Sequence, residues 1–359
     1  MSASVDKWIG CLVGLAIGDA LGTLTRGRLR TPSTRSMRLA LQPKGRVGLY
    51  MVDTQRALLV AESLAARGQA DPDDLCQRFI QMAQGPDHLP MGGFRGAGRN
   101  FRTSVNRLRT GWPWKETGAD SAGIGAATRI APVPLAIRDE ENLQEAVVRL
   151  SLPTHRDPRA IAAAASLARI IHDDIHADPN TEIGVQKRLK SVRRFTRRTE
   201  EYLHRVYPEI LSLDYTPLLH QMSSMLTVVE ECLPLEQDEA LGRIARRVAD
   251  MYGESVRPTS GLCLAGLSAA LWFACAHEFR FGDAVAAACG AGGNSSAIGA
   301  IVGAICGAIH PETIPQAWRD SLVNVDQIAI RALRLAGQES FPHVTRDLYE
   351  SELIWTERY

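Results

Sequence analysis

The chain has 359 residues, 45% of them hydrophobic, which is enough to bury a large core as one big domain or two ordinary ones. Its 41 Lys and Arg residues nearly balance its 40 Asp and Glu residues, giving a formal net charge of +1. This balance excludes a global field that would draw nucleic acid or an anionic membrane to the protein, so any electrostatic recognition must be local.

The N-terminal stretch MSASVDKWIGCLVGLAIGDALG contains one lysine and no long apolar core, so it is a poor secretory signal. The seven cysteines are odd in number and include no C-x-x-C pair. We therefore expect a cytoplasmic protein whose thiols are reduced and buried.

Helical periodicity dominates the chain. Apolar residues recur at spacings of three and four over residues 57–64 and again over residues 161–170. Few segments alternate with a period of two, and clusters of β-branched residues are short. These patterns predict an all-α fold.

Residues 85–123 concentrate glycine, proline and tryptophan, in GPDHLPMGGFRGAGRN and then TGWPWKETGADSAG. The composition predicts long loops around one short helix. Because long irregular segments in a compact domain usually have a function, we expect this segment to form the walls of a cleft.

Residues 187–198, KRLKSVRRFTRR, contain seven basic residues and no acidic one. Val185, Leu189, Val192 and Phe195 recur at helical spacing, which favours an amphipathic helix with a solvated basic face. The alternative is a surface that binds an acidic protein partner, while nucleic acid is the less favoured ligand.

No charged residue occurs from Ala284 to Ile309, a length that raises the question of a transmembrane segment. The break GAGGNSS divides it into pieces too short to span a bilayer, so we expect two buried helices around a polar turn and no membrane insertion. Gly299, Gly303 and Gly307 lie four residues apart, which predicts a helix face that a neighbouring helix can approach closely.

Several segments stand in a characteristic order along most of the chain. They are WIGCLVGLAIGDALG, YMVDTQRALLVAESL, SAGIGAATRIAPVPLA, THRDPRAIAAAA, SGLCLAGLSAALWFA, FGDAVAAACGAGGNSSAIGAIVGAICGAIHPETIP and a late helix at Trp318. In this order they resemble the ADP-ribosylglycohydrolase superfamily, which includes dinitrogenase reductase-activating glycohydrolase and J1-crystallin. The resemblance implies one compact all-α domain over residues 1–359 with a central cleft, and we expect a variable helical insertion over residues 174–235.

The resemblance also implies a chemistry. In that family two magnesium ions lie between helix N-termini and bind an ADP-ribose group, and water attacks the anomeric carbon to release ADP-ribose from a modified arginine or serine. Divalent cations can orient ribose hydroxyls and organise the attacking water, and magnesium requires hard oxygen ligands, chiefly carboxylates.

Both metal motifs of the family are degenerate in this chain. The family's Thr-Asp-Asp-Thr corresponds to Met51-Val52-Asp53-Thr54, and its Gly-Gly-Asp-Thr-Asp-Thr corresponds to GGNSSA at residues 292–297. Asp53 is the one acid that remains. We therefore expect no magnesium centre and no other cofactor, with Asp53 as the candidate catalytic residue only if hydrolysis persists.

The ligand-binding loop of the family is partly kept. Its glycine-rich segment corresponds to Gly123, Gly125 and Arg129, and its Thr-His pair corresponds to Thr154 and His155. Glycine backbone N–H groups before a helix can hold a phosphate, but the same glycines can simply permit a tight loop against the core. Similarly, Thr154-His155 can contact a ligand, or Thr154 or Asp157 can cap the helix that follows.

Two further places are candidates for ligand binding. A glutamate that the family often has near the scissile bond corresponds to Arg26, which cannot accept a proton at neutral pH. The turn formed by Gly292, Gly293, Asn294, Ser295 and Ser296 begins a helix, where Asn294 or Ser295 can cap and the dipole favours an anion. We expect Asp19, within GDALG, to pack or cap a helix and not to act in catalysis.

Three functions follow from these residues. The first is a pseudoenzyme that binds ADP-ribose or a related nucleotide, or a protein partner, with Arg26, Arg56 and Arg129 replacing the charge of the metal ions. The second is a divergent, metal-independent hydrolase of an ADP-ribosyl or other N- or O-glycosidic bond, with Asp53 as general base and His155 as its auxiliary. The third is an interaction protein that uses residues 187–198.

Overall fold

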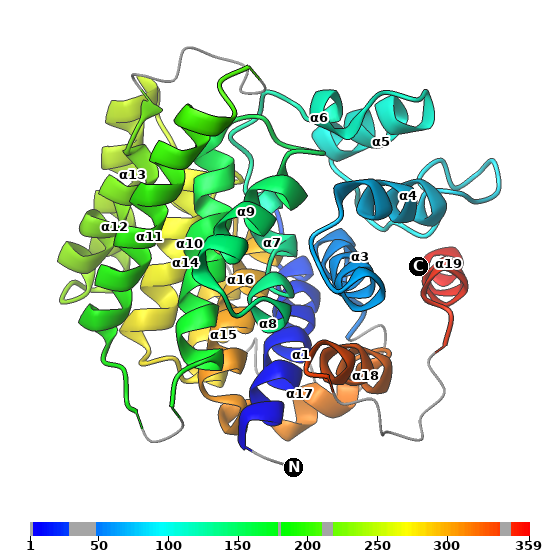
Figure 1. The fold of residues 1–359 in the computed structure, drawn as a ribbon. Helices are drawn as coiled ribbons and strands as arrows, with labels where there is room; N and C mark the ends of the chain where they lie inside the picture. The colour runs from blue at the N-terminus through cyan, green and yellow to red at the C-terminus, as the bar shows by residue number, and fades with distance from the viewer. Residues whose placement is uncertain (1–2, 29–47, 179–180, 210–217, 338–345) are drawn as a thin grey trace.

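The two helices at the centre of the fold are α1 (Ala3–Thr23) and α16 (Ser295–Ile309), which lie against each other along most of their length (Figure 1). The computed structural model describes residues 3–28, 48–178, 181–209, 218–337 and 346–359. The close approach predicted from the glycines of α16 is confirmed, because a Cβ atom on Gly299, Gly303 or Gly307 would clash with the backbone of α1.

The partner of this glycine face is a matching one on α1. Gly10, Gly14 and Gly18 repeat every four residues and face Gly307, Gly303 and Gly299 in antiparallel order. Without Cβ atoms the two backbones touch directly, and the dispersion attraction between them offsets the low helix propensity of glycine.

The other helices surround this pair. In chain order they are α3 (Val52–Arg67), α4 (Pro72–Met82), α5 (Arg99–Arg109), α6 (Trp114–Thr117), α7 (Gly125–Arg129), α8 (Val133–Ala136), α9 (Glu140–Ser151), α10 (Pro158–Ile175), α11 (Val185–Val206), α12 (Gln221–Cys232), α13 (Gln237–Tyr252), α14 (Cys263–Ala276), α15 (Phe281–Gly290), the 3₁₀ helix η2 (Pro311–Thr313), α17 (Gln316–Ser321), α18 (Val325–Leu335) and α19 (Leu348–Arg358). Across the described ranges two isolated bridges are the only β-type pairing, so the predicted all-α fold is confirmed.

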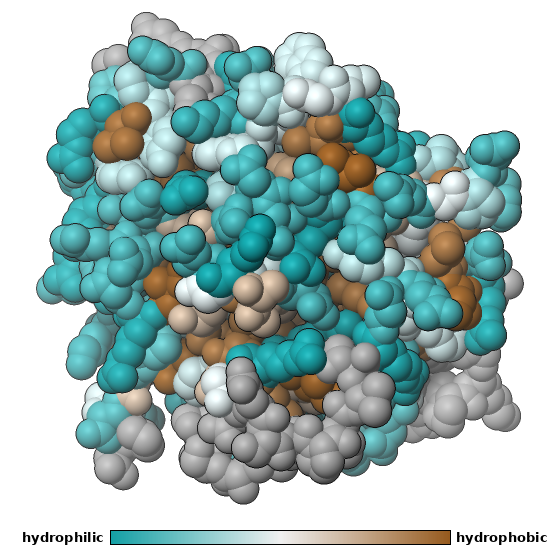
Figure 2. Space-filling view, turned by 45° about the vertical axis from the view of Figure 1, so that its right-hand side comes forward, coloured by the Kyte–Doolittle hydropathy of each residue, from teal (hydrophilic) through white to brown (hydrophobic). Residues whose placement is uncertain are grey.

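These helices form one compact domain with two sides. Helices α11, α12 and α13 lie on one side of α1 and α16, and α3, α4 and α5 lie on the other (Figure 1). Figure 2 turns the side of α3–α5 toward the viewer, and it shows a mainly hydrophilic surface with separate hydrophobic patches. One large hydrophobic core, with buried residues from most of the helices, suits a single domain of this length.

Segment 85–123 contains more helix than we predicted. Besides the one-turn α6, it contains α5, which buries Phe101, Val105 and Leu108 along one face. These apolar residues recur at spacings of four and three, a helical signal that the flanking glycines and tryptophans obscured. The expectation of loops around one short helix is therefore corrected.

Two buried helices around a polar turn are confirmed by α15 and α16, which the turn at residues 291–294 connects. No helix in the described ranges is long and apolar enough to cross a membrane. All seven cysteines are free thiols and all are buried, as predicted from their spacing.

The basic run belongs to α11, an amphipathic helix, as predicted. Leu189, Val192 and Phe195 are buried. The expectation of a fully solvated basic face is wrong at Arg188, which is buried and forms an ion pair with Asp174. Within 174–235 the described residues include helices α11 and α12 with irregular segments between them, and the variability of that insertion stays a prediction.

Candidate functional site

The surviving acid of the first motif, Asp53, lies in the first turn of α3 and is buried. Arg56, one turn later, forms an ion pair with the Oδ1 atom of Asp53. The hydroxyl of Thr128 on α7 donates a hydrogen bond of 2.8 Å to the same oxygen. Arg56 and Thr128 are themselves buried, so protein groups already engage one oxygen of this carboxylate.

Asp19 caps α3 from α1, which confirms the role predicted for it. Its Oδ2 atom accepts hydrogen bonds from the backbone N–H groups of Met51 and Thr54, both at 3.0 Å, and from the Thr54 hydroxyl at 2.8 Å. Complete burial, and next the charge of Asp53, raise the pKa of Asp19 to about 7. The backbone of residues 51–54 is thus held in place from a different helix, although Met51 offers no cap of its own.

The glycine loop before α7 lies beside His155. Backbone hydrogen bonds join Ala119 to both Thr154 and Arg156, which places His155 next to Gly123 and Gly125. A Cβ atom added to Gly125 would lie 3.3 Å from Cε1 of His155 and 3.0 Å from Nη1 of Arg56. Glycine here therefore keeps the imidazole and the guanidinium close to the loop backbone.

His155 is a buried, neutral imidazole. Its Nδ1 atom lies 2.7 Å from the Thr154 hydroxyl. Burial first, and then the charges of Arg129 and Arg56, lower the pKa of His155 well below its ordinary value. Thr154 and Asp157 were both candidates to cap α10. The structure shows that Asp157 is the cap, because its side chain accepts a hydrogen bond from the N–H of Arg159.

Arg129 is not placed to bind a ligand, which corrects one sequence prediction. It is completely buried, and its guanidinium donates to the backbone oxygens of Gly125, Leu150 and Ser151 at 3.0, 2.9 and 3.1 Å. The last two oxygens belong to the C-terminal end of α9, where the helix dipole favours a cation. Burial, followed by the charge of Arg56, lowers the pKa of Arg129 to about 9. Arg129 therefore ties α7 to α9.

The second degenerate motif forms a tight turn. Gly292 and Gly293 have φ angles of 73° and 70°, a left-handed conformation that favours glycine. The backbone of Gly293 exchanges hydrogen bonds with Gly27 and Arg28 after α1, and the N–H of Asn294 donates to the Thr259 carbonyl at 2.7 Å. The turn is thereby bound to two other segments of the chain.

The predicted capping of α16 is wrong. Asn294 occupies the N-cap position, but its side chain makes no capping hydrogen bond. The hydroxyl of Ser295 donates instead to the Gly22 carbonyl of α1 at 2.7 Å, because Gly22 lets the two helices approach closely. The hydroxyl of Ser296 is buried with no hydrogen-bond partner.

Residues 259–262 join the two halves of the site; the sequence analysis named most of this segment as a landmark of the family but did not predict it as part of the site. The carbonyl of Gly261 accepts from the N–H of Ile124 at 2.9 Å, and the side chain of Asn294 lies beside Gly261. Its signal in the sequence is TSGLC, where a glycine just before an apolar helix permits such close contact. Through this segment, the glycine loop and the 292–296 turn form one continuous region.

Arg26 lies at the edge of this region. Its side chain is exposed, and its Nη1 atom lies 3.7 Å from the Cβ position of Gly96 in segment 85–98. The same position on Gly96 is 3.1 Å from the Cε atom of Met51. The structure therefore brings Arg26 near residues 51–54, as the family correspondence implies.

The residues present do not fit the two magnesium ions that the resemblance implies. In the part of the chain that the structure describes, no group of three or more His, Cys, Asp and Glu side chains is placed to hold a metal ion. Asp53 is paired with Arg56, and residues 294–296 offer an amide and two hydroxyls. Magnesium gives up water reluctantly, so neutral oxygens and one paired carboxylate are a poor replacement for several carboxylates.

The fold and the position of these two motifs at the N-termini of α3 and α16 define the class of protein. The model of the ADP-ribosylglycohydrolase family matches residues 1–343. This chain belongs to the ADP-ribosylglycohydrolase family.

Relatives with named activities are distant. The chain is 30% identical over 178 residues to ADP-ribosyl-[dinitrogen reductase] glycohydrolase of Rhodospirillum rubrum, covering 46% of this chain and 57% of that protein. It is 27% identical to ADP-ribosylarginine hydrolase Tri1 of Serratia proteamaculans, covering 95% and 82%, and 25% identical to ADP-ribosylhydrolase ARH3 of Danio rerio, covering 96% and 93%. A solved structure described as an ADP-ribosylglycohydrolase-related protein complex superposes with a TM-score of 0.65 at 24% identity, covering 94% of this chain and 99% of that one. This last similarity shows the fold alone.

Proposed function

We propose that this protein is a non-catalytic member of its family that binds ADP-ribose or a related nucleotide without magnesium. The observation that supports the proposal best is the ion pair between Asp53 and Arg56. It places a fixed positive charge beside the one carboxylate that remains from the metal motifs. In this proposal the cation of Arg56 replaces the divalent ions that the resemblance implies.

The ligand would contact the glycine loop and the groups around it. Arg56 lies beside Gly125, and Arg26 lies at the edge near residues 51–54. An arginine guanidinium can hold a phosphate through two parallel hydrogen bonds and so neutralise the negative charge that a magnesium ion would otherwise neutralise. Neutral His155 and the amide of Asn294 would supply hydrogen bonds for sugar hydroxyls.

The alternative function is a metal-independent hydrolase with Asp53 as general base. Hydrolysis of a glycosidic bond without metal ordinarily uses two carboxyl groups. Arg56 and Thr128 already engage the Oδ1 atom of Asp53, so only Oδ2 could accept a proton, and this pairing favours binding over hydrolysis. A cytoplasmic location remains part of the proposal and is consistent with seven free, buried thiols.

Calorimetry with ADP-ribose, run once with magnesium and once with a chelator, tests the proposal. We expect the same affinity in both conditions, with a loss of about tenfold in Arg26→Ala, because this change removes a charge-assisted contact to phosphate. Arg334→Met, a change on the exposed face of α18, is the control and should leave the affinity unchanged. Binding that requires magnesium would contradict the proposal.

A second experiment separates binding from hydrolysis. The protein is incubated with a peptide that has ADP-ribosylated arginine, and released ADP-ribose is measured. We expect no release above the rate in buffer. Release that is abolished by Asp53→Asn would establish the alternative function, whereas release that survives this change would point to contamination.

A further inference from the structure

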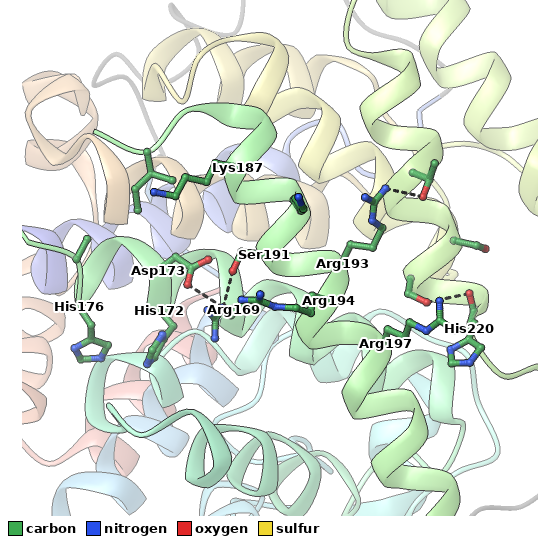
Figure 3. Close-up of a pocket in the computed structure, with 16 residues that line it drawn as sticks. Arg169, His172, Asp173, His176, Lys187, Ser191, Arg193, Arg194, Arg197 and His220 are labelled. Carbon is green, nitrogen blue, oxygen red and sulfur yellow. Dashed lines mark hydrogen bonds and ion pairs between the residues drawn. The ribbon is translucent and has the colours of Figure 1, made fainter. Parts of the chain in front are cut away.

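A basic groove lies on the side of the molecule opposite α3–α5, between α10, α11 and α12 (Figure 3). Its volume is about 1010 Å³. Most of its charged side chains come from α11, the helix that contains the basic run, and its histidines come from α10 and from the start of α12. The groove uses no residue of the candidate nucleotide site.

Cations in and around this groove are of two kinds. Arg169 forms ion pairs with Glu140 at 2.6 Å and with Asp173 at 2.8 Å, so its charge is already compensated. Lys187, Lys190 and Arg194 are exposed and have neither an ion pair nor a hydrogen bond with any residue that the structure describes. They lie at spacings of three and four, hence on one face of α11. The groove thus has a row of uncompensated positive charges.

This charged surface extends across α12. A second groove of about 510 Å³ lies between α12 and α13 and contains Arg246 and Arg247. The two grooves share Ser224 and Thr227, so they meet on the surface of α12. A ligand that fills both must be extended, which argues against a compact small molecule.

The other groups of the two grooves match a peptide better than a nucleic acid strand. Neither lining contains Phe, Tyr or Trp, on which single-stranded bases usually stack. Hydroxyl oxygens of Ser224 and Thr227 can accept hydrogen bonds from peptide N–H groups.

We propose that the grooves on either side of α12 form a binding site for an extended acidic segment of a partner protein. Carboxylates of the segment pair with Lys187, Lys190 and Arg194, and its backbone N–H groups donate to the hydroxyls of Ser224 and Thr227. The site is independent of the nucleotide site and does not depend on the proposed function.

Fluorescence anisotropy with a labelled oligo-glutamate peptide, a labelled oligo-thymidine strand and the full chain tests this site. We expect the peptide to bind with an affinity that falls as salt is added and to bind more tightly than the strand. The triple variant Lys187→Glu, Lys190→Glu, Arg194→Glu should weaken peptide binding by about tenfold or more, because three pairs are replaced by repulsion.

The control variant changes the net charge by the same amount as the triple variant, but at positions outside both grooves. Lys115→Glu, Arg205→Glu, Arg334→Glu reverses three exposed cations that line neither groove and should retain the affinity of the unchanged protein. Circular dichroism verifies that both variants are folded. Equal losses in the two variants, tighter binding of the oligo-thymidine strand, or no binding of the peptide at low salt would each overturn the proposal.

Discussion

At the scale of single residues, Arg56 is the partner of the one acid of the first motif. Its side chain pairs with Asp53 three residues earlier, and both groups are buried. Removing one member of a buried pair leaves the other charge unpaired, so the loss of either residue alone would be costly. Asp19 accepts hydrogen bonds from the backbone at this point and thereby fixes the start of α3.

Glu200 on α11 lies in an environment that disfavours its ionised form. It is buried, and its Oε1 atom accepts from the N–H groups of Met222 and Ser223 at the start of α12. Burial raises the pKa of Glu200 to about 7, against weaker lowering effects of these hydrogen bonds. Since this pKa lies above that of the unfolded chain, Glu200 contributes stability that is present at low pH and is lost as pH rises through 7.

We predict that Glu200→Gln removes this pH dependence. Relative to the unchanged protein, the variant should gain about 1 kcal/mol or more of unfolding free energy between about pH 6 and pH 8, because glutamine accepts the same hydrogen bonds without titrating. Urea denaturation at both pH values measures the difference. Glu201→Gln, one residue away on the exposed side, should show no such gain, and a gain of equal size there would contradict the assignment.

At the scale of helices, the pairing of α1 with α16 depends on glycine. A Cβ atom on Gly303 would overlap the carbonyl of Gly14 on α1, whereas one on Gly290, at the end of α15, would meet nothing within 4 Å. We predict that Gly303→Ala lowers the unfolding free energy by about 3 kcal/mol or more through forced separation of the helices. Gly290→Ala should be neutral or slightly stabilising. Thermal unfolding of the two variants measures the contrast, and equal melting temperatures would refute it.

Helix α19 lies beyond the family match and is held by one buried carboxylate. Glu352 accepts hydrogen bonds from Tyr50 at 2.5 Å and Gln55 at 2.8 Å and forms an ion pair with Arg95 at 2.6 Å. Both members of the ion pair have fully buried side chains. The backbone carbonyl of Arg95 also accepts a hydrogen bond from the N–H of Val52, the first residue of α3. Through the Arg95–Glu352 pair, α19 therefore supports the start of α3.

We predict that Glu352→Ala costs about 3–5 kcal/mol of unfolding free energy, because Arg95 is left as an unpaired buried charge. Glu350→Ala, on the exposed face of the same helix, should cost less than about 1 kcal/mol. Denaturant titration of both variants measures the costs. A cost for Glu352→Ala as small as that of Glu350→Ala would show that α19 is not anchored by this pair.

For the whole molecule, the proposed binding of a nucleotide without magnesium predicts indifference to magnesium. A ligand that binds the folded state raises the melting temperature through mass action, so a bound magnesium pair would stabilise the fold. We predict the same melting temperature with excess magnesium and with a chelator, measured by scanning calorimetry. A reproducible rise with magnesium would show that the described residues do hold the ion.

Helical periodicity, the family resemblance and the degenerate motifs could all be read from the sequence, because the period of three to four residues and the order of motifs are local properties. The glycine repeat of α1 was visible in the same way, as Gly10, Gly14 and Gly18, and would have predicted the partner of α16. The local sequence pattern could not predict in which direction a polar side chain points or which group it contacts.

Only the tertiary structure decided which partners these side chains have. Arg129 follows a glycine loop, as a phosphate-binding arginine does, yet the fold places it against the end of α9. Ser295 begins a helix, yet it bonds to α1 instead of capping. The partner of each group comes from a segment distant in sequence, and burial requires it to be satisfied by whatever group the packing brings near. The sequence alone therefore determined the fold class, while packing determined which partner each of these polar residues has.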